Sequence, residues 1–411
     1  MPFPAKILVI TNGPLARNPR TYKEVSALGH AGYDVTALTV RNHAPSEPND
    51  LALMRDAPFR RIALDIGSSE QHLGLRAFRR RGSQWLARKI ACFTGWQTPR
   101  ALGPMGPLLR LARRLPADLT IVHNEVPHCV GRRLMDEGRL VAADLEDWHS
   151  EDLLPEDRLS RPLRLIRETE RDILHRAVYT ATTSHALAAA LHARYGGTRP
   201  HVIANSFPLQ PAPAARSATD GPPAFFWFSQ TLGPGRGLES FLAAWSLTRH
   251  PSRLVLLGET RPGFDTEILA RLPADFRARV TFLPLLPPAE LPALIARHDI
   301  GLALEQSFIL NRDLTITNKI LQYLNAGLAV VASDTAGQRE VLAHDSTAGV
   351  IVATHETTAF AATLDALLAD RAALARRQTA ARHLAESVYC WEREAPRLVA
   401  LVAAALAEPS P

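Results

Sequence analysis

Lys319 and Gln322 lie in a segment whose apolar residues recur at the spacing of one helix face. Gly327 then marks the helix end, because glycine readily takes the left-handed conformation that stops a helix. The apolar run 328–332 is long enough for a strand buried on both faces, and the polar loop 333–337 follows it. Ligands bind outside the carboxyl ends of strands in open parallel sheets. This lysine and glutamine therefore suit a ligand with phosphates and hydroxyls.

A second segment, 229–237, has the composition of an anion-binding loop. It contains three glycines, follows the strand-like run 224–228 and precedes a helical pattern. Free backbone N–H groups and the helix dipole at such a helix start favour negative charge. An arginine can grip phosphate oxygens at two points. We therefore expect Gly235, Arg236 and Gly237 to bind phosphate.

The first predicted strand of the chain, 6–11, ends in polar and basic residues. Asn12 and Gly13 form a turn signal directly after it, and Arg17 and Arg20 follow in the basic loop. At the carboxyl end of a first strand these residues are placed to face a ligand cleft. The alternative is a solvated loop with no binding role.

Two later strands also end in candidate residues. His123 closes the strand 118–123, while Asp147 and His149 follow the strand 140–145. The polar cluster could build a site or cap the next helix. Neither group shows a recognisable metal-ligand spacing, so we expect no metal site and no cofactor.

The elements that must position these residues alternate as strand and helix through both halves of the chain, which predicts an α/β fold of parallel, doubly wound sheets. A chain of 411 residues is long enough for two domains. The proline-rich segment 208–223 reads as a linker. We expect an N-terminal domain at 1–207, a second domain at 224–385 and a C-terminal helix within 386–411.

Composition limits the cellular setting. The formal net charge is +6, and the three cysteines are isolated, which fits a reduced compartment. No apolar stretch approaches the roughly 20 residues of a membrane span. The chain start leads directly into a strand-like run, so we expect no signal peptide and a cytoplasmic protein.

The segment 76–114 contains ten Lys or Arg and no Asp or Glu, interleaved with Trp, Phe and Leu. A basic helix of this kind can lie on an anionic membrane surface. It can equally be a solvated helix whose apolar side packs on its own sheet. No nucleic-acid-binding signature accompanies it, and we expect no nucleic acid partner.

A family resemblance joins these features. The sequence NKILQYLNAGLAVVASDTAGQREVL, at 318–342, resembles the donor-site segment of GT-B glycosyltransferases of family 4, the group 1 type. Arg236 and Gly237 fall on the last two positions of the family's Gly-x-x-x-x-x-Lys/Arg-Gly loop, and His123 on the second His of its Asp-Leu-Ile-His-x-His-Asp strand. The resemblance covers nearly the whole chain, with its motifs in the expected order.

The resemblance implies two Rossmann-like domains facing a cleft (GT-B), with a C-terminal helix crossing back to the first domain. The second domain would hold a nucleotide-sugar donor, and the first a glycan or lipid-linked acceptor. His123 would be catalytic. The implied donor residues are Gly235, Arg236, Gly237, Asn318, Lys319 and Gln322. The implied acceptor or cleft residues are Asn12, Gly13, Arg17, Arg20, Asp147 and His149.

This copy departs from the family at two glutamates spaced eight apart, which are Leu314 and Gln322 here. Glu305 or Asp313 could supply the first carboxylate. The resemblance implies a retaining, metal-independent transfer. Two alternatives stay open on the same fold, a non-catalytic nucleotide-sugar-binding protein and a nucleotide-sugar epimerase. The sequence leaves open the base, the sugar, the acceptor and the oligomeric state.

Overall fold

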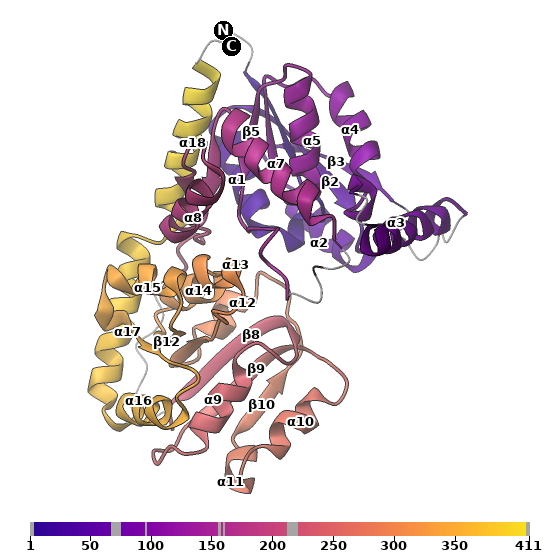
Figure 1. Ribbon diagram of the computed structural model, residues 1–411. Helices are drawn as coiled ribbons and strands as arrows, with labels where there is room; N and C mark the ends of the chain where they lie inside the picture. Colours follow the sequence, from indigo (N-terminus) through magenta and orange to yellow (C-terminus); the bar gives the residue numbers. More distant parts are fainter. Residues whose placement is uncertain are drawn as a thin grey trace. The chain divides into compact units, whose positions relative to one another are not determined.

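The computed structural model of the protein describes residues 4–66, 75–94, 97–154, 158, 161–211 and 221–407. The chain folds into two compact units. The first contains Met1–Ile203 and Ala395–Pro411, and the second contains Ala204–Glu394. Each unit has its own parallel sheet (Figure 1).

The first unit is built on a seven-stranded sheet with the order β3-β2-β1-β4-β5-β6-β7. All its strand pairs are parallel. Its strands are β1 (Lys6–Ile10), β2 (Asp34–Arg41), β3 (Arg60–Asp65), β4 (Leu119–His123), β5 (Val141–Asp144), β6 (Thr180–Thr182) and β7 (His201–Val202). Helices connect the strands: η1 (Leu15–Arg17), α1 (Pro19–His30), η2 (Ala44–Ser46), α2 (Glu47–Leu53), α3 (Leu75–Thr94), η4 (Pro99–Ala101), α4 (Met105–Arg114), α5 (Glu125–Asp136), α7 (Leu163–Arg176) and α8 (His185–Tyr195).

The second unit has a six-stranded sheet with the order β10-β9-β8-β11-β12-β13. Its strands are β8 (Ala224–Leu232), β9 (Arg253–Thr260), β10 (Val280–Leu283), β11 (Ile300–Ala303), β12 (Ala329–Ser333) and β13 (Gly349–Val352). Its helices are α9 (Leu238–Trp245), α10 (Phe264–Ala270), α11 (Ala274–Arg277), α12 (Leu291–Ile295), α13 (Leu310–Leu314), α14 (Asn318–Asn325), α15 (Ala336–Ala343), η5 (Ser346–Ala348), α16 (Thr357–Ala369) and α17 (Arg371–Ser387). The predicted fold class, two doubly wound parallel α/β domains, is confirmed.

Strand order reverses once in each sheet, between β1 and β4 in the first and between β8 and β11 in the second. At such a point the loops after the two neighbouring strands run to opposite faces and leave a crevice at the carboxyl edge. Asn12 follows β1 and His123 ends β4, while Arg236 follows β8 and Glu305 follows β11. The topology thus brings the sequence-predicted residues to the two binding edges.

Packing in the second unit fixes the position of α14. Alternating residues of β8 point to opposite faces, so Phe225 and Trp227 join one core cluster and Phe226 joins the other. A Cβ at Gly301 of β11 would lie 2.2 Å from the ring of Tyr323. Glycine therefore lets the Tyr323 ring pack directly on the sheet, and this seats α14 above β11.

The last helix, α18 (Trp391–Ala407), begins in the second unit and has most of its residues in the first. Part of the predicted linker, 212–220, lies outside the described residues. β8 continues to Leu232, beyond the predicted end of that strand at 228, with an irregularity between Phe228 and Thr231. Among the described helices, none combines the length and apolar character that a bilayer crossing requires.

Candidate active site

The site in the second unit lies where β8 and β11 end. Gly237 precedes α9 with φ 82°, in the left-handed region that favours glycine. A Cβ at this position would lie 2.5 Å from the carbonyl oxygen of Leu304. Glycine is therefore required here, and it allows the loop after β8 to contact the segment after β11.

Arg236 projects from this loop beside other charged residues. Its Nη1 donates to the Ser229 Oγ at 3.1 Å. Partial burial and the neighbouring Arg312 lower the pKa of Arg236, against the attraction of Glu305. A guanidinium stays protonated at neutral pH even when its pKa falls. Two arginines thus flank one carboxylate at this edge.

Lys319, in the first turn of α14, forms an ion pair with Glu305. Its Nζ donates to Glu305 Oε1 at 2.7 Å, and the side chains are 16% and 14% exposed. Burial would raise the pKa of Glu305, but Lys319, Arg312 and Arg236 together outweigh burial and lower it. Lys319 also lies 5.6 Å from the centre of the Trp227 ring. The edge therefore carries three cations around one ionised carboxylate.

The structure distinguishes the two carboxylates that could replace the glutamate absent at Leu314. Glu305 contacts Lys319. Asp313 instead accepts a hydrogen bond from the Ala336 amide at 3.2 Å, at the start of α15. Glu305 is thus the carboxylate that lies with the predicted donor residues, and Arg312 is a further cation that the sequence reasoning missed.

The other predicted donor residues are placed differently. Asn318 Oδ1 accepts from Asn205 Nδ2 at 2.8 Å. Gln322 lines a separate pocket of about 50 Å³ with Phe207 and Pro208. Gly235 has its amide bonded to Glu239 Oε1 at 3.0 Å. The roles of these residues in donor binding stay predictions.

The first unit has a polar pocket at the carboxyl ends of β1, β4 and β5, with a volume of about 310 Å³. Four of the six predicted acceptor residues line it, namely Asn12, Gly13, Asp147 and His149. The sequence reasoning did not assign the remaining lining residues to this site, which are Asn18, Asn124, Glu125, Asp152 and Arg161. Arg161 forms an ion pair with Glu125. No local motif marks Arg161, because it reaches the pocket from the segment before α7.

Asn124 gives this pocket a strained wall. Its φ is 66° and its ψ is 166°, a combination that residues other than glycine rarely adopt. Its Oδ1 accepts from Thr11 Oγ1 at 2.9 Å and from the Asn12 amide at 3.3 Å. These two bonds hold the turn after β4 against the turn after β1.

The structure does not bring Arg17 or Arg20 to this pocket. Arg17 is exposed in η1. Arg20 is buried, with its Nε 2.7 Å from Asp144 Oδ2 and its Nη1 donating to the Ile203 carbonyl at 2.7 Å. Arg20 therefore ties α1 to β5 and to the segment after β7.

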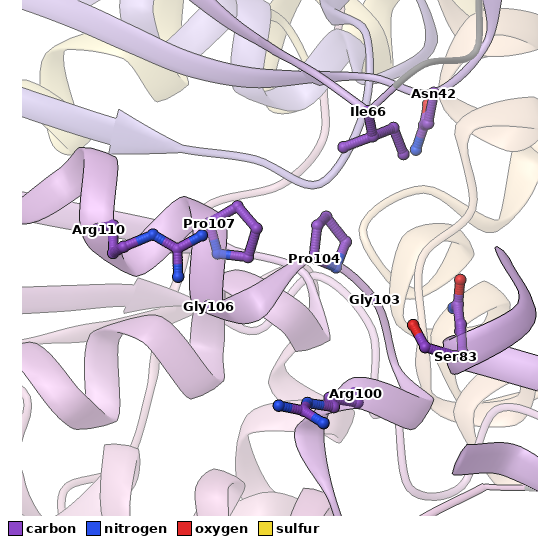
Figure 2. Close-up of a pocket in the computed structure, with 10 residues that line it drawn as sticks. Asn42, Ile66, Ser83, Arg100, Gly103, Pro104, Gly106, Pro107 and Arg110 are labelled. Atoms are coloured by element: carbon purple, nitrogen blue, oxygen red, sulfur yellow. The ribbon is translucent and has the colours of Figure 1, made fainter. Parts of the chain in front are cut away.

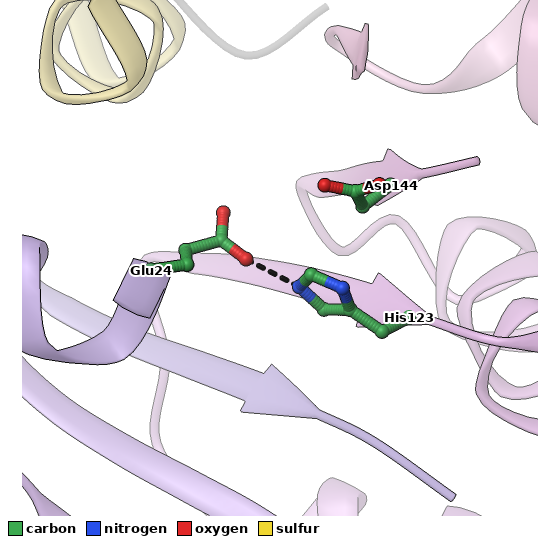
Figure 3. A group of neighbouring side chains, drawn as sticks. All are labelled: Glu24, His123 and Asp144. Carbon is green, nitrogen blue, oxygen red and sulfur yellow. Dashed lines mark hydrogen bonds and ion pairs between the residues drawn. The ribbon is translucent and has the colours of Figure 1, made fainter. Parts of the chain in front are cut away.

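His123, the predicted catalytic residue, is 1% exposed at the end of β4. Its Nε2 is bonded to Glu24 Oε2 of α1 (Figure 3), and its Nδ1 has no hydrogen-bond partner in the described part of the chain. Burial would lower the pKa of His123, but Glu24 outweighs burial and the pKa is raised. His123 is thus buried and bonded to Glu24, and its catalytic role stays a prediction.

Glu24, His123 and Asp144 could in principle hold a metal, because their ligand atoms lie within 4.8 Å of one another. Arg20, however, is already bonded to Asp144. A cation at that carboxylate and a histidine of raised pKa oppose a further positive ion. The group therefore fits a buried ion-pair network better than a metal site.

Burial sets the protonation of residues around the end of β5, which are Glu146 and His149 after the strand and His128 of α5. It lowers the pKa of His149 to about 4, and it lowers that of His128 to about 3 with help from His149. Burial, together with Asp147, raises the pKa of Glu146 to about 7. Near neutral pH this edge thus offers neutral imidazoles and a carboxyl group able to exchange its proton, a pattern that functional sites often show.

Comparison with known proteins places this geometry in a family. Residues 223–370 match the model of the family described as Glycosyl transferases group 1. These matched residues all lie within the second unit. The match contains the Arg236 loop, Glu305 and Lys319, so the cations described above belong to the matched region. The predicted glycosyltransferase enzyme is confirmed at this level. No curated protein matches the chain in sequence.

Solved structures resemble the chain over nearly its full length. Sucrose-phosphate synthase from Thermosynechococcus elongatus has a TM-score of 0.71 at 16% identity, covering 97% of this chain and 98% of that one. HepE from Anabaena, solved with UDP and glucose, has a TM-score of 0.69 at 16% identity, covering 97% and 100%. Trehalose 6-phosphate synthase from Burkholderia multivorans has a TM-score of 0.65 at 15% identity, covering 98% and 99%. At these identities the likeness shows the fold, which is GT-B as the sequence predicted.

Proposed function

We propose that the protein transfers a sugar from a nucleotide-diphosphate sugar to a glycan or lipid-linked acceptor. The observation that carries this proposal is the convergence of Arg236, Arg312 and Lys319 at the carboxyl edge of the matched unit. Cleavage at the anomeric carbon leaves negative charge on the departing diphosphate. Preorganised cations stabilise such a charge more strongly than reorienting water does.

The proposed transfer retains the anomeric configuration and uses no metal ion. Retention rests on the family resemblance. Metal independence is supported by Arg236 and Lys319, which can supply positive charge at the leaving group from the protein itself. HepE from Anabaena has been solved with UDP and with UDP-glucose, and this supports a uridine nucleotide as the first donor to test.

Glu305 favours a catalyst over a protein that only binds its ligand. The sequence lacks the paired glutamates at Leu314 and Gln322, but Glu305 restores an ionised carboxylate beside Lys319. Arg236, Arg312 and Lys319 would otherwise face one another without a counter-charge. A site that had lost its function would have little reason to keep this arrangement.

The proposal includes contact with an anionic membrane surface through α3. In the segment 76–114, side chains are described for 82–90, 93 and 97–114. Gln84 and Arg88 donate to the carbonyls of Leu102 and Ala101, so one side of α3 packs near η4. Trp85, Leu86 and Phe93 are 62%, 52% and 82% exposed. These large apolar residues do not pack on the unit's own sheet, and together with the basic residues they suit a membrane interface.

A donor panel tests the transfer. The purified protein is incubated with UDP, GDP, ADP and their glucose conjugates, and its melting temperature and the release of nucleoside diphosphate are measured. We expect one base to raise the melting temperature and its sugar conjugate to release nucleoside diphosphate in the presence of acceptor extract. Arg236→Ala and Lys319→Ala should lose both effects.

Arg271→Ala is the matched control, because Arg271 is an exposed cation of the same unit that forms an ion pair with Glu267, away from the Lys319 site. If Arg271→Ala also loses nucleotide binding, the losses in Arg236→Ala and Lys319→Ala would not locate the binding site. Conversion of the donor without an acceptor would indicate an epimerase. Binding without turnover in any extract would indicate a binding protein. Unchanged affinity in Arg236→Ala and Lys319→Ala would show that the donor lies elsewhere.

A further inference from the structure

A second pocket of the first unit, with a volume of about 470 Å³, is lined by groups that suit an anion (Figure 2). Asn42 follows β2 and Ile66 follows β3, so the pocket opens at the same carboxyl edge as the polar pocket. Its other walls come from α3, η4 and the first turns of α4. The lining residues are Asn42, Ile66, Ser83, Gln84, Arg100, Gly103, Pro104, Gly106, Pro107 and Arg110. Pockets of this size hold small organic ligands.

Among the lining residues that the structure describes, Arg100 and Arg110 are the charged ones, and none is Asp or Glu. Within the described residues, neither guanidinium forms an ion pair or a hydrogen bond. Nearby arginines are engaged: Arg113 forms an ion pair with Glu137, and Arg88 donates to the Ala101 carbonyl. Within the described part of the chain, these two positive charges are therefore uncompensated, while Arg88 and Arg113 of the same basic segment are bonded.

The first turn of α4 adds to the attraction for an anion. α4 runs for ten residues from Met105, and its dipole places partial positive charge at this end. A Cβ at Gly106 would lie 3.7 Å from Arg110 Nη1, so the guanidinium lies back over the helix start. The Gly106 amide is among the first N–H groups of a helix, which have no partner within the helix.

Amide groups in the same wall suit sugar hydroxyls. Asn42 Nδ2 donates to the Asn12 carbonyl at 2.8 Å, and Gln84 Nε2 donates to the Leu102 carbonyl at 3.2 Å. These bonds fix both amides through their nitrogens, and an amide oxygen can accept bonds from hydroxyl groups. The lining thus combines cations with hydroxyl acceptors, as a phosphorylated sugar requires.

The pocket adjoins the polar pocket through Asn12. Asn12 lines the polar pocket and is bonded to Asn42 of the second one. A Cβ at Gly103 would lie 3.9 Å from Asn12 Oδ1 and 3.2 Å from Val126. One residue therefore separates the two pockets, which allows one extended ligand to contact both.

We propose that this second pocket binds a phosphate group of the acceptor, with Arg100 and Arg110 as its ligands, an inference that rests on the proposed transfer function. The acceptor is then a phosphorylated sugar or a lipid-linked sugar diphosphate. Its sugar hydroxyls bond the Asn42 and Gln84 amides. Arginine suits this role because its planar donors match phosphate oxygens in pairs.

Isothermal titration with two probes tests the pocket. Glucose 6-phosphate represents a soluble sugar phosphate, and farnesyl diphosphate represents a lipid-linked diphosphate. The proteins are the wild type, Arg100→Gln/Arg110→Gln and the control Lys89→Gln/Arg114→Gln. The control removes the same charge from the same basic segment but leaves the pocket lining intact. Lys319→Ala is included because a diphosphate could also bind the donor edge.

We expect at least one probe to bind the wild type, the control and Lys319→Ala alike, and to bind the pocket variant roughly a hundredfold more weakly through the loss of two charge-assisted contacts. Binding of glucose 6-phosphate would indicate a soluble acceptor, and binding of farnesyl diphosphate would indicate a lipid-linked acceptor. Equal weakening in the control, loss in Lys319→Ala, or no binding of either probe would overturn the proposal.

The same proteins are titrated with the donor nucleotide. We expect the pocket variant to keep its nucleotide affinity, which also shows that it is folded. Loss of nucleotide affinity in the pocket variant would overturn the assignment, because the substitutions would then act on the whole protein. If the wild type binds no nucleotide, the proposed transfer function is contradicted. The titrations with the two phosphate probes still test the pocket independently.

Discussion

Lys319 is paired with Glu305 before any donor is bound, and this shapes what the residue can do. At 2.7 Å the two charges are close, and both side chains are mostly buried. A diphosphate at this edge must share the ammonium with the carboxylate. Glu305 therefore holds Lys319 in place, but it also weakens the attraction between the Lys319 ammonium and a donor diphosphate.

Lys319→Ala should separate binding from stability. We expect it to raise the barrier to transfer by about 2–4 kcal/mol, the effect of losing one preorganised charge donor. It should also lower the free energy of unfolding by about 1–3 kcal/mol, because the Glu305 carboxylate loses its partner. In Lys319→Ala/Glu305→Gln the stability should return and the activity should not. Urea unfolding and initial rates measure the two effects, and recovery of activity in the double variant would show that Lys319 serves only Glu305.

The His123–Glu24 pair should make stability depend on pH. The pKa of His123 is raised in the folded state, so the folded protein binds more protons than the unfolded chain above about pH 6.5. The contribution of this pair is therefore complete below that pH and is lost as the pH rises through the folded pKa. Urea unfolding from pH 6.5 to 9 should show this decline. Glu24→Gln should make the decline shallower, and the part that remains belongs to Glu146, whose raised pKa of about 7 acts in the same direction.

His128 and His149 act in the opposite direction. Their pKa values of about 3 and about 4 lie below the ordinary value, so their contribution is present above about pH 6.5 and is lost as the pH falls. This is why the test of His123 belongs above pH 6.5. If the free energy of unfolding depends on pH with the same slope in the wild type and in Glu24→Gln, the His123–Glu24 pair does not contribute to the pH dependence.

At the scale of the element, the conformation of the loop between β8 and α9 depends more on Gly237 than on Gly235. Gly235 and Gly237 both have positive φ, but a Cβ meets nothing within 4 Å at Gly235 and meets the Leu304 carbonyl at 2.5 Å at Gly237. Gly235→Ala should cost about 1 kcal/mol of backbone strain and keep nucleotide binding. Gly237→Ala should displace the loop and weaken nucleotide binding roughly tenfold or more. Titration of both variants checks this, and equal affinities would show that the loop does not hold the donor.

Helix α3 carries the prediction about membranes. Trp85→Ser/Phe93→Ser should abolish co-sedimentation with vesicles that contain phosphatidylglycerol, because both aromatic side chains are more than half exposed on the helix. Leu51→Ser is the control, since Leu51 is 59% exposed on α2 of the same unit. High salt should weaken the binding of the wild type. If wild-type protein stays in the supernatant at low salt, α3 is not a membrane contact.

The sequence predicted the helices and strands well, because the signals for them lie within each segment. Apolar runs and turn residues mark β1, β4, β8 and β12, and the rule about carboxyl edges then locates Asn12 and Arg236. The partners of these residues depend on tertiary structure. Glu24 reaches His123 from 99 positions away, and Arg20 is withdrawn into an ion pair that no local pattern indicates.

The molecule as a whole consists of two units, each with its own sheet, and the edge that carries Arg236 and Lys319 belongs to the second. A nucleotide at a hundred times its dissociation constant stabilises its binding unit by about 2.7 kcal/mol. If the nucleotide binds the second unit, hydrogen exchange should slow in the segments 229–237 and 304–306 and in α14, while the core strands β1 and β4 stay unchanged. Protection that appears first in β1 and β4 would place the nucleotide in the other unit.

Asn124 combines a strained backbone conformation with hydrogen bonds that fix the pocket wall. A glycine would accept the φ of 66° without strain, yet the chain keeps a residue whose side chain joins the turns after β1 and β4. An engineer who seeks a more heat-resistant enzyme should therefore leave this position alone, because the hydrogen bonds that would be lost also shape the pocket wall.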